Sequence, residues 1–262
     1  MNLPLKFLNQ QILTSVGLLS VLAMIVDAYV TGTWGMMIGS LVYSNIIVSL
    51  VCSQIILHRY FSHRCFAVNV LVHKTLCIIS VLPGQGSPIA WAAAHRHHHK
   101  HSDTELDNHS PKESYFLAMG GWLLKGYDWV VTKKKLRTIP TDLLRDKFVV
   151  KIDTYYYYIW YCLIIVSAAI SYKFLLYFIL APIGTALIIA SLVTLGCHIK
   201  LPGSYRSFDT ADDTHNNMYV QWLVLGDALH NNHHCDPTKW DLKMKKNEID
   251  IAGIIINVIR KN

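Results

Sequence analysis

The stretch FLLYFILAPIGTALIIASLVTLGC, residues 174–197, runs for 24 residues without a charged side chain and ends immediately before His198. At a rise of about 1.5 Å per residue, a helix of this length reaches about 36 Å, slightly more than the roughly 30 Å hydrocarbon core of a bilayer. The sequence therefore predicts a transmembrane helix here, with a histidine just beyond its end.

Three further apolar segments have the length of a membrane span, namely residues 12–30, 34–57 and 155–172. Asp27 is the one charge in the first of them, and it lies near the end, where a carboxylate reaches the interface. With 52% hydrophobic and only 16% charged residues, the composition argues against an ordinary soluble protein. We expect an all-α membrane protein with four transmembrane helices in two hairpins, which turn at residues 31–33 and at Lys173.

The basic residues indicate the orientation of these spans. Of 24 lysines and arginines, 14 lie between His58 and Asp153, 8 follow Cys197, and Lys6 falls on the same side, which leaves only Lys173 on the other. The positive-inside rule makes the basic side cytoplasmic, with both chain ends there. The first apolar stretch is predicted to be a span and not a cleaved signal peptide, because no small-residue cleavage site follows it. Nothing in the sequence indicates a nucleic-acid partner.

Two shorter apolar segments do not fit as spans. Residues 66–82 carry Asn69, His73 and Lys74, and a span there would separate His58 from the later histidines, so we expect an interfacial or re-entrant segment. Residues 251–259 are too short to cross and are expected at the surface. These segments and the loops would form a cytoplasmic helical cap. Without internal repeats or linkers, residues 1–262 are predicted to be a single integral-membrane domain.

Histidine is concentrated in three short motifs. The chain has 14 histidines, and the motifs are HRYFSH with His58 and His63, HRHHHKH with His95, His98 and His99, and HNNHH with His230, His233 and His234. Residues at i, i+3 and i+4 share a helix face, so each HxxHH is predicted to present three imidazoles to one metal ion. With His198, nine imidazoles would meet at one membrane face, too many for one ion. Two metals are therefore implied, although imidazole suits iron, zinc, copper and nickel alike.

The other histidines are expected outside this site. His97 and His101 flank the second motif but point elsewhere on a helix, and His73, His101, His109 and His215 are interpreted as interfacial or surface residues. One HxxHH alone would be unremarkable on a helix surface, and HRHHHKH alone could be a metal-buffering tract. Three such motifs on one predicted face favour a metal site.

The chain resembles the membrane-bound fatty acyl desaturases of the stearoyl-CoA (delta-9) type. The resemblance rests on HRYFSHR, WAAAHRHHHKHSDTELDNHSP, GGWLLKG, DDTHNN and GDALHNNHHCDP, which begin at residues 58, 91, 120, 212 and 226. The HNNHH form and the short chain are more similar to bacterial members, which favours a bacterial inner membrane over the endoplasmic reticulum as the location.

The resemblance implies two iron ions ligated by His58, His63, His95, His98, His99, His198, His230, His233 and His234. In the family, an asparagine four residues before the ninth histidine reaches one iron through a water, and this chain has Thr194 there. A threonine hydroxyl could still hold a water. Asp227 stands where the family usually has a glutamate, and it is predicted to orient a ligand imidazole, as are Asp103 and Asp107.

The implied reaction is O2-dependent formation of a cis double bond, at the delta-9 position, in a long-chain acyl substrate, with O2 reduced to water. An arginine–aspartate pair that contacts CoA in animal members is Ala93 and Ala94 here, so the acyl carrier could be CoA, carrier protein or membrane lipid. Electrons would come from a separate ferredoxin, rubredoxin or cytochrome b5. Lysines 133–135 with Arg137 are a candidate docking patch, or else a solvated charge run near lipid headgroups.

Two other functions remain open at this stage. A hydroxylase or methyl oxidase of the same di-iron superfamily would share the histidine motifs, and its product would distinguish it. A membrane metal transporter or storage protein is a more distant alternative. Transporters bury ionisable ligands near the bilayer midplane, whereas here the histidines follow the spans.

Overall fold

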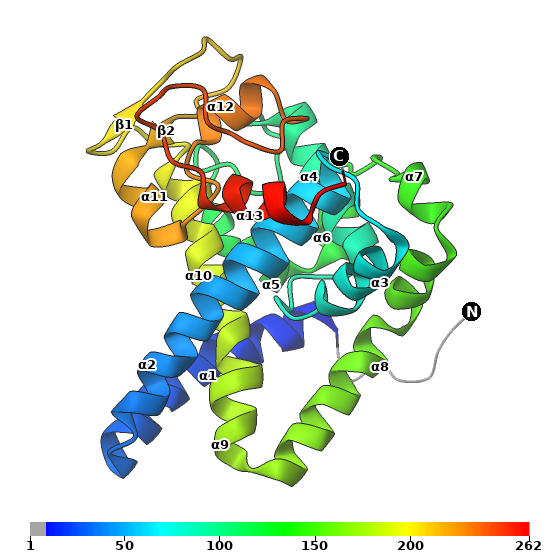
Figure 1. The fold of residues 1–262 in the computed structure, drawn as a ribbon, viewed down its shortest axis with the longest axis vertical. Coiled ribbons are helices and arrows are strands. Elements are labelled where there is room, and N and C mark those ends of the chain that lie inside the picture. The colour runs from blue at the N-terminus through cyan, green and yellow to red at the C-terminus, as the bar shows by residue number, and fades with distance from the viewer. Residues whose placement is uncertain (1–8, 262) are drawn as a thin grey trace.

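The computed structural model describes residues 9–261, which are predominantly helical (Figure 1). Lys6, which entered the charge count above, lies outside the described residues, as do both chain ends. Within the described part, the one sheet is a short antiparallel pair of strands, β1 (Ser204–Tyr205) and β2 (Asn216–Asn217). The expectation of a mostly helical protein is confirmed.

Long helices form one end of the molecule, and shorter helices gather at the other (Figure 1). The long elements are α1 (Gln10–Thr31), α2 (Trp34–Tyr43) continued by the π-helical segment η1 (Ser44–Ser62), α8 (Lys147–Ile170), and α9 (Tyr172–Phe174) continued by the π-helical η3 (Leu175–Leu180) and α10 (Ala181–Gly196). The shorter elements are α3 (Val70–Ile79), α4 (Pro88–His101), the π-helical η2 (Leu117–Gly121), α5 (Trp122–Lys125), α6 (Tyr127–Lys133), α7 (Thr141–Leu144), α11 (Met218–Val224), α12 (His230–Cys235) and α13 (Ile251–Ile259).

Among residues 9–261, three helices are long and apolar enough to cross a membrane: Gln10–Thr31, Trp34–Ser62 and Tyr172–Gly196. Apolar side chains of α1 such as Leu19, Leu22 and Val26 are more than 60% exposed, as befits a surface that faces lipid. The fourth predicted span, residues 155–172, coincides with most of α8 but does not meet these criteria. Lysines and Asp153 lie in the first turns of α8, and a run of tyrosines follows them.

The two hairpin turns differ in how well they were predicted. Gly32 follows α1 with a φ of +70°, a left-handed conformation that glycine adopts without steric cost, so the first turn is where it was expected. The second turn lies at Ser171, whose extended backbone separates α8 from α9 and whose hydroxyl caps Phe174. Lys173 is inside the following helix, so the expected turn at Lys173 was two residues too late.

Close helix packing holds α10 against α1. A Cβ atom added to Gly184 would lie 2.4 Å from the carbonyl oxygen of Gly17, so only glycine allows this approach of the two backbones. Pro182 lies where the π-helical η3 passes into α10, inside the continuous helix Tyr172–Gly196, and its ring removes one backbone donor there. This packing brings the end of α10, and with it His198, toward the end of the molecule where the shorter helices gather, which is called the cap below.

The segment η1 is the central element of the core. Leu50, Ile55 and Ile56 of η1 are almost fully buried and belong to one hydrophobic cluster with Trp160 of α8 and Ile256 of α13. The helix within residues 66–82 is the ten-residue α3, too short to cross a bilayer, and α13 coincides with the predicted surface helix. The end of η1 is thereby fixed next to α4, α12 and α13.

Candidate metal centre

The first histidine motif depends on π-helical geometry. His58 and His63 are five residues apart, a spacing that an α-helix places on different faces. In η1, however, the backbone N–H of His63 donates to the carbonyl of His58 at 3.1 Å, an i→i+5 bond typical of a π-helix. The two rings therefore lie on one side, with centroids 5.0 Å apart.

The three imidazoles of each HxxHH motif do not face one metal position, contrary to the prediction from the sequence. On α4, His95 and His99 turn toward one cluster of imidazoles, whereas His98 belongs to another. On α12, His233 joins His95 and His99, whereas His230 and His234 join His98. The histidines four apart stay together because they are one helical turn apart, and the remaining one points toward the neighbouring cluster. Each of the two helices therefore contributes to both clusters.

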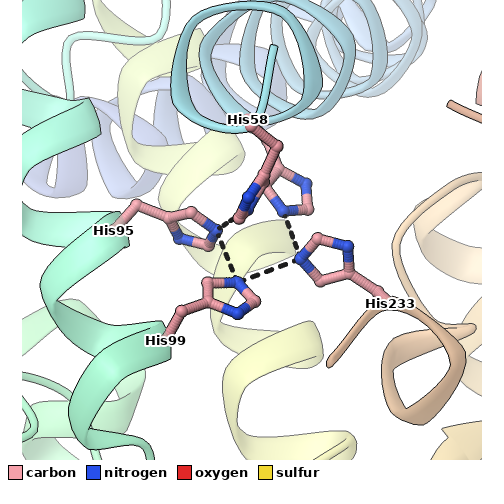
Figure 2. Close-up of side chains that lie close together, drawn as sticks. His58, His95, His99 and His233 are labelled. Carbon is pink, nitrogen blue, oxygen red and sulfur yellow. Dashed lines mark hydrogen bonds between the residues drawn. The ribbon is translucent and has the colours of Figure 1, made fainter. Parts of the chain in front are cut away.

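The five-histidine group consists of His58, His63, His95, His99 and His233, whose ligand atoms all lie within 4.8 Å of one another. Figure 2 shows the labelled rings of this group turned toward a common point from three separate elements. The Nε2 atoms of His58 and His233 are 2.9 Å apart, and those of His99 and His233 are 3.0 Å apart. Two nitrogens bound at about 2.1 Å to one ion, at a right angle, would be roughly 3 Å apart. The spacing fits a single metal ion.

The four-histidine group consists of His98, His198, His230 and His234, again with ligand atoms within 4.8 Å of one another. His198, just beyond α10, reaches His230 with an Nε2–Nε2 distance of 3.1 Å. The nine histidines singled out in the sequence thus come together as two neighbouring groups that could each hold a metal.

Aspartates hold four of these imidazoles by the nitrogen that faces away from the group. The Nδ1–carboxylate distances are 2.6 Å for His58 and Asp227, 2.9 Å for His98 and Asp107, 3.0 Å for His198 and Asp103, and 2.6 Å for His234 and Asp212. A carboxylate that accepts from Nδ1 fixes the tautomer and leaves the Nε2 lone pair for a metal. Asp227, Asp103 and Asp107 therefore lie where orienting residues should be.

Asp212 was not predicted from the sequence as an orienting residue, although it belongs to the DDTHNN motif. It lies in a loop before β2, 22 residues from the histidine it holds, and no periodicity places a loop residue against a helix. Thr194 was singled out in the sequence, and its hydroxyl lines the cavity beside the site. The hydroxyl donates to the carbonyl of Ala118 and is hydrogen-bonded to no histidine among residues 9–261.

Removing the Asp212 carboxylate should weaken metal binding to the four-histidine group. We expect Asp212→Asn to lower the affinity of that site by about 10–100-fold, because His234 loses the acceptor that orients it. Metal retained during a chelator titration measures the effect. Asp213→Asn is the matched control, since the carboxylate of Asp213 is exposed and pairs with Lys112. Equal metal retention in the two variants would contradict this role for Asp212.

Burial and crowding favour the neutral form of most of these imidazoles. Desolvation, followed by repulsion from neighbouring histidines, lowers the pKa well below its usual value in six rings, those of His63, His95, His99, His230, His233 and His234. Burial alone would raise the pKa of the Asp227 carboxyl, but His58 and Arg59 lower it below its ordinary value. Neutral rings beside ionised carboxylates suit a cation, which needs free nitrogen lone pairs.

The remaining histidines follow the expectation with one exception. His109 was predicted at the surface, but it is only 7% exposed and its ring lies 4.0 Å from that of His98. The turn after Asp107 folds it back against α4, so the prediction was wrong. His97 is buried with Nε2 3.0 Å from the carbonyl of Leu106, away from both groups. The partly buried His73, His101 and His215 also lie outside the two groups.

The predicted basic patch is only partly a surface feature. Lys134 is 3% exposed, pairs with Glu113 and donates to the carbonyl of Glu105 at 2.9 Å. Its ammonium therefore stabilises the fold of the cap. Lys133, Lys135 and Arg137 are exposed, so the patch is smaller than the lysine run suggested.

A cavity runs beside both histidine groups. His58 and His95 of one group and His98 and His230 of the other form part of its wall. Apolar side chains of α5 and α10, Trp122, Leu123, Leu187 and Val193, form much of the rest. An apolar chain in this cavity would pass close to both metal positions.

The apolar helices and the paired histidine groups indicate a membrane protein with a histidine-rich centre that could bind metal. Comparison with known proteins agrees: the fatty acid desaturase family model matches residues 32–241. The chain belongs to the fatty acid desaturase family.

Three relatives illustrate the range of this family. A chloroplastic probable lipid desaturase from Arabidopsis thaliana is 30% identical over 70% of this chain and 50% of its own length. An icosanoyl-CoA 5-desaturase from Limnanthes douglasii is 30% identical over 78% of this chain and 56% of its own. An sn-1 stearoyl-lipid 9-desaturase from Anabaena variabilis is 25% identical over 78% and 73%. The chain spans about half the length of the first two.

Proposed function

We propose that this protein is an O2-dependent fatty acyl desaturase with a di-iron centre, which forms a cis double bond in a long-chain acyl substrate. The observation that carries the proposal is the pair of histidine groups beside one apolar cavity. The five-histidine group would hold one iron and the four-histidine group the other. When bound, the irons supply the oxidising power that no acid–base side chain has for an unactivated methylene.

The residues of this chain would bind the acyl substrate, orient the metal ligands and exclude water from the site. Asp227 and Asp212 hold His58 and His234 in the tautomer that a metal needs. The apolar wall of the cavity accepts methylene groups, and their burial there would help to drive substrate entry. A chain bound beside both histidine groups places neighbouring carbons within reach of the centre.

We further propose delta-9 selectivity, with CoA, carrier protein or membrane lipid as the acyl carrier. The printed names of the relatives include both CoA-linked and lipid-linked substrates and both the 5 and the 9 position, so the family leaves these choices open. Electrons would come from a separate ferredoxin, rubredoxin or cytochrome b5. Residues 1–262 would form one domain in a bacterial inner membrane.

Expression in a host of known lipid content tests the reaction. Fatty-acid methyl ester analysis should show a new cis-unsaturated product, and purified protein should contain about two iron per chain, as two histidine groups require. A hydroxylated product would instead favour the hydroxylase alternative. Zinc alone in active protein, or a single metal per chain, would contradict the di-iron proposal.

The proposed sidedness takes α8 as a fourth span and places the basic cap in the cytoplasm. Reporter fusions after Lys112 and Lys173 should read cytoplasmic and external, respectively, because the cap carries most of the basic residues. An external signal at Lys112 would mean that residues 66–82 cross the membrane, contrary to the short helix α3.

A further inference from the structure

The turn between α11 and α12 carries the aspartate that orients His58, and one of its residues has an unusual backbone conformation. Leu225 has a φ of +65°, a left-handed conformation that is unfavourable for leucine. Two residues later, the Asp227 carboxylate holds Nδ1 of His58 at 2.6 Å and accepts from Arg59 at 2.9 Å. A strained turn keeps a single conformation only where the surrounding structure holds it, so we looked for the contacts that hold this one.

The side-chain amide of Gln54 binds the turn on both sides of Leu225. Its Oε1 accepts from the backbone N–H of Asp227 at 2.9 Å, and its Nε2 donates to the carbonyl of Val224 at 2.8 Å. Val224 is the last residue of α11, where helical carbonyls lack partners within the helix. Gln54 is only 6% exposed, so bulk water has little access to these bonds. One amide therefore satisfies a backbone acceptor and a backbone donor of the same turn.

The residue between these two bonds is a glycine, and the close approach of the amide requires it. A Cβ atom added to Gly226 would collide with Oε1 of Gln54. The N–H of Leu225 donates in turn to the carbonyl of Gln221 at 2.9 Å, which closes the end of α11. These contacts together determine the backbone path from α11 to Asp227.

Gln54 is well placed to connect this turn with the metal centre. It lies four residues before His58 in η1, about one helical turn away, and Gln54, His58 and Asp227 all line the cavity. His58 and Asp227 are 169 residues apart in the chain, so no local pattern brings the carboxylate to the ring. Gln54 makes this connection because it shares a helix with His58 and binds the backbone of the segment that carries Asp227.

Two other side chains of η1 reach the same region but do not have this role. Arg59 binds the carboxylate of Asp227 and leaves its backbone N–H free for Gln54. Asn45 donates to the carbonyl of Leu223 at 3.0 Å, within α11 and ahead of the turn, and it is partly exposed. Gln54 is thus the described side chain of η1 that holds the turn itself.

We propose that Gln54 is a positioning residue of the five-histidine group. Its amide fixes the turn of residues 224–227, so that the Asp227 carboxylate meets Nδ1 of His58 and leaves the Nε2 of that ring for the metal. Gln54 acts through Asp227 and His58, and the inference rests on the metal centre of the proposed function.

The test compares Gln54→Met with Asn45→Leu in the purified full-length protein. Methionine keeps the length of the Gln54 side chain but removes both hydrogen bonds, so the turn should no longer hold Asp227 in place. One of the two irons should be lost to a chelator about 10-fold more readily than in the wild type, and only the Mössbauer signal of that iron should change. Asn45→Leu is the control, because it removes a hydrogen bond to α11 without touching the turn, and it should keep both irons.

Hydrogen exchange in the metal-free protein tests the same contact without iron. The Asp227 amide should exchange about 2–10-fold faster in Gln54→Met than in the wild type, because it loses its acceptor. Gly226→Ala should have the same effect from the other side of the contact, since the added Cβ would displace Oε1 of Gln54. Amides in the middle of α10 should exchange at the wild-type rate in both variants.

The possible outcomes separate a positioning role from a general structural one. Unchanged exchange of the Asp227 amide together with unchanged iron retention in Gln54→Met would overturn the inference. Equal loss of both irons would also overturn it, because Gln54 would then stabilise the fold as a whole. A wild-type protein without two irons would instead contradict the proposed function, and the exchange rates would still decide whether Gln54 holds the turn.

Discussion

Desaturation should fall by at least about 100-fold in His198→Ala, while the protein remains inserted in the membrane. His198 is almost completely buried, lies 3.1 Å from His230 and is held by Asp103, so the variant removes one of only four imidazoles in its group. Loss of an orienting partner alone typically costs about 10–100-fold, and loss of the imidazole itself should cost more. Burial opposes protonation of His198, but Asp103 outweighs it and raises the pKa of the ring. This electrostatic pull would equally favour a bound cation.

The unsaturated product fraction, measured in membranes with matched protein levels, checks this result. His215→Ala is the control: its ring is partly exposed and outside both histidine groups, and its link to the site is the backbone bond from its N–H to the carbonyl of Cys197. It should retain most of the activity. Activity near the wild-type level in His198→Ala would contradict the proposal that His198 is a metal ligand.

The second large effect concerns the stability of the cap. Arg59→Met should lower the free energy of unfolding by about 3–5 kcal/mol, because it leaves two buried carboxylates without their counter-ion. The Arg59 side chain is 0% exposed and lies 2.9 Å from Asp227 and 2.6 Å from Asp250. Asp250 in turn caps the first turn of α13 through the N–H of Gly253. The Arg59 guanidinium therefore links two aspartates: Asp227, which orients His58, and Asp250, which caps the C-terminal helix α13.

Thermal unfolding in mild detergent measures the loss, and Arg64→Met is the matched control. Arg64 lies five residues further on, pairs with Asp142 at 3.5 Å, and has a side chain that is 58% exposed. Exposed pairs of this kind contribute below about 1 kcal/mol. Equal melting temperatures of the two variants would mean that the buried network around Arg59 is not what anchors α13.

Much of the architecture and of the site was readable from the sequence. Uncharged runs such as residues 174–197 predict long apolar helices because the hydrocarbon thickness dictates their length. The histidine motifs identified the nine imidazoles that the structure groups, since spacing along a helix determines which residues share a face. The orienting role of Asp103, Asp107 and Asp227 could also be predicted, because these residues lie close to the histidine motifs in the sequence.

What could not be predicted depends on contacts between distant segments. The π-helical winding that aligns His58 with His63 arises in a densely packed segment and has no reliable signature in the sequence. Asp212 and His109 lie in loops, whose paths are set by tertiary packing. The ion pair of Lys134 with Glu113 joins two parts of the cap, so the lysine run looked like a surface feature.

The division of each HxxHH motif between the two histidine groups would determine the spacing of the two proposed metals. Because α4 and α12 each supply imidazoles to both groups, the two groups are separated by a short stretch of helix, which backbone hydrogen bonds make stiff. The backbones of α4 and α12 would therefore hold the two proposed metals at a fixed spacing, although His58, His63 and His198 are attached to the ends of η1 and α10. An acyl chain that enters or leaves the cavity would then leave this spacing unchanged.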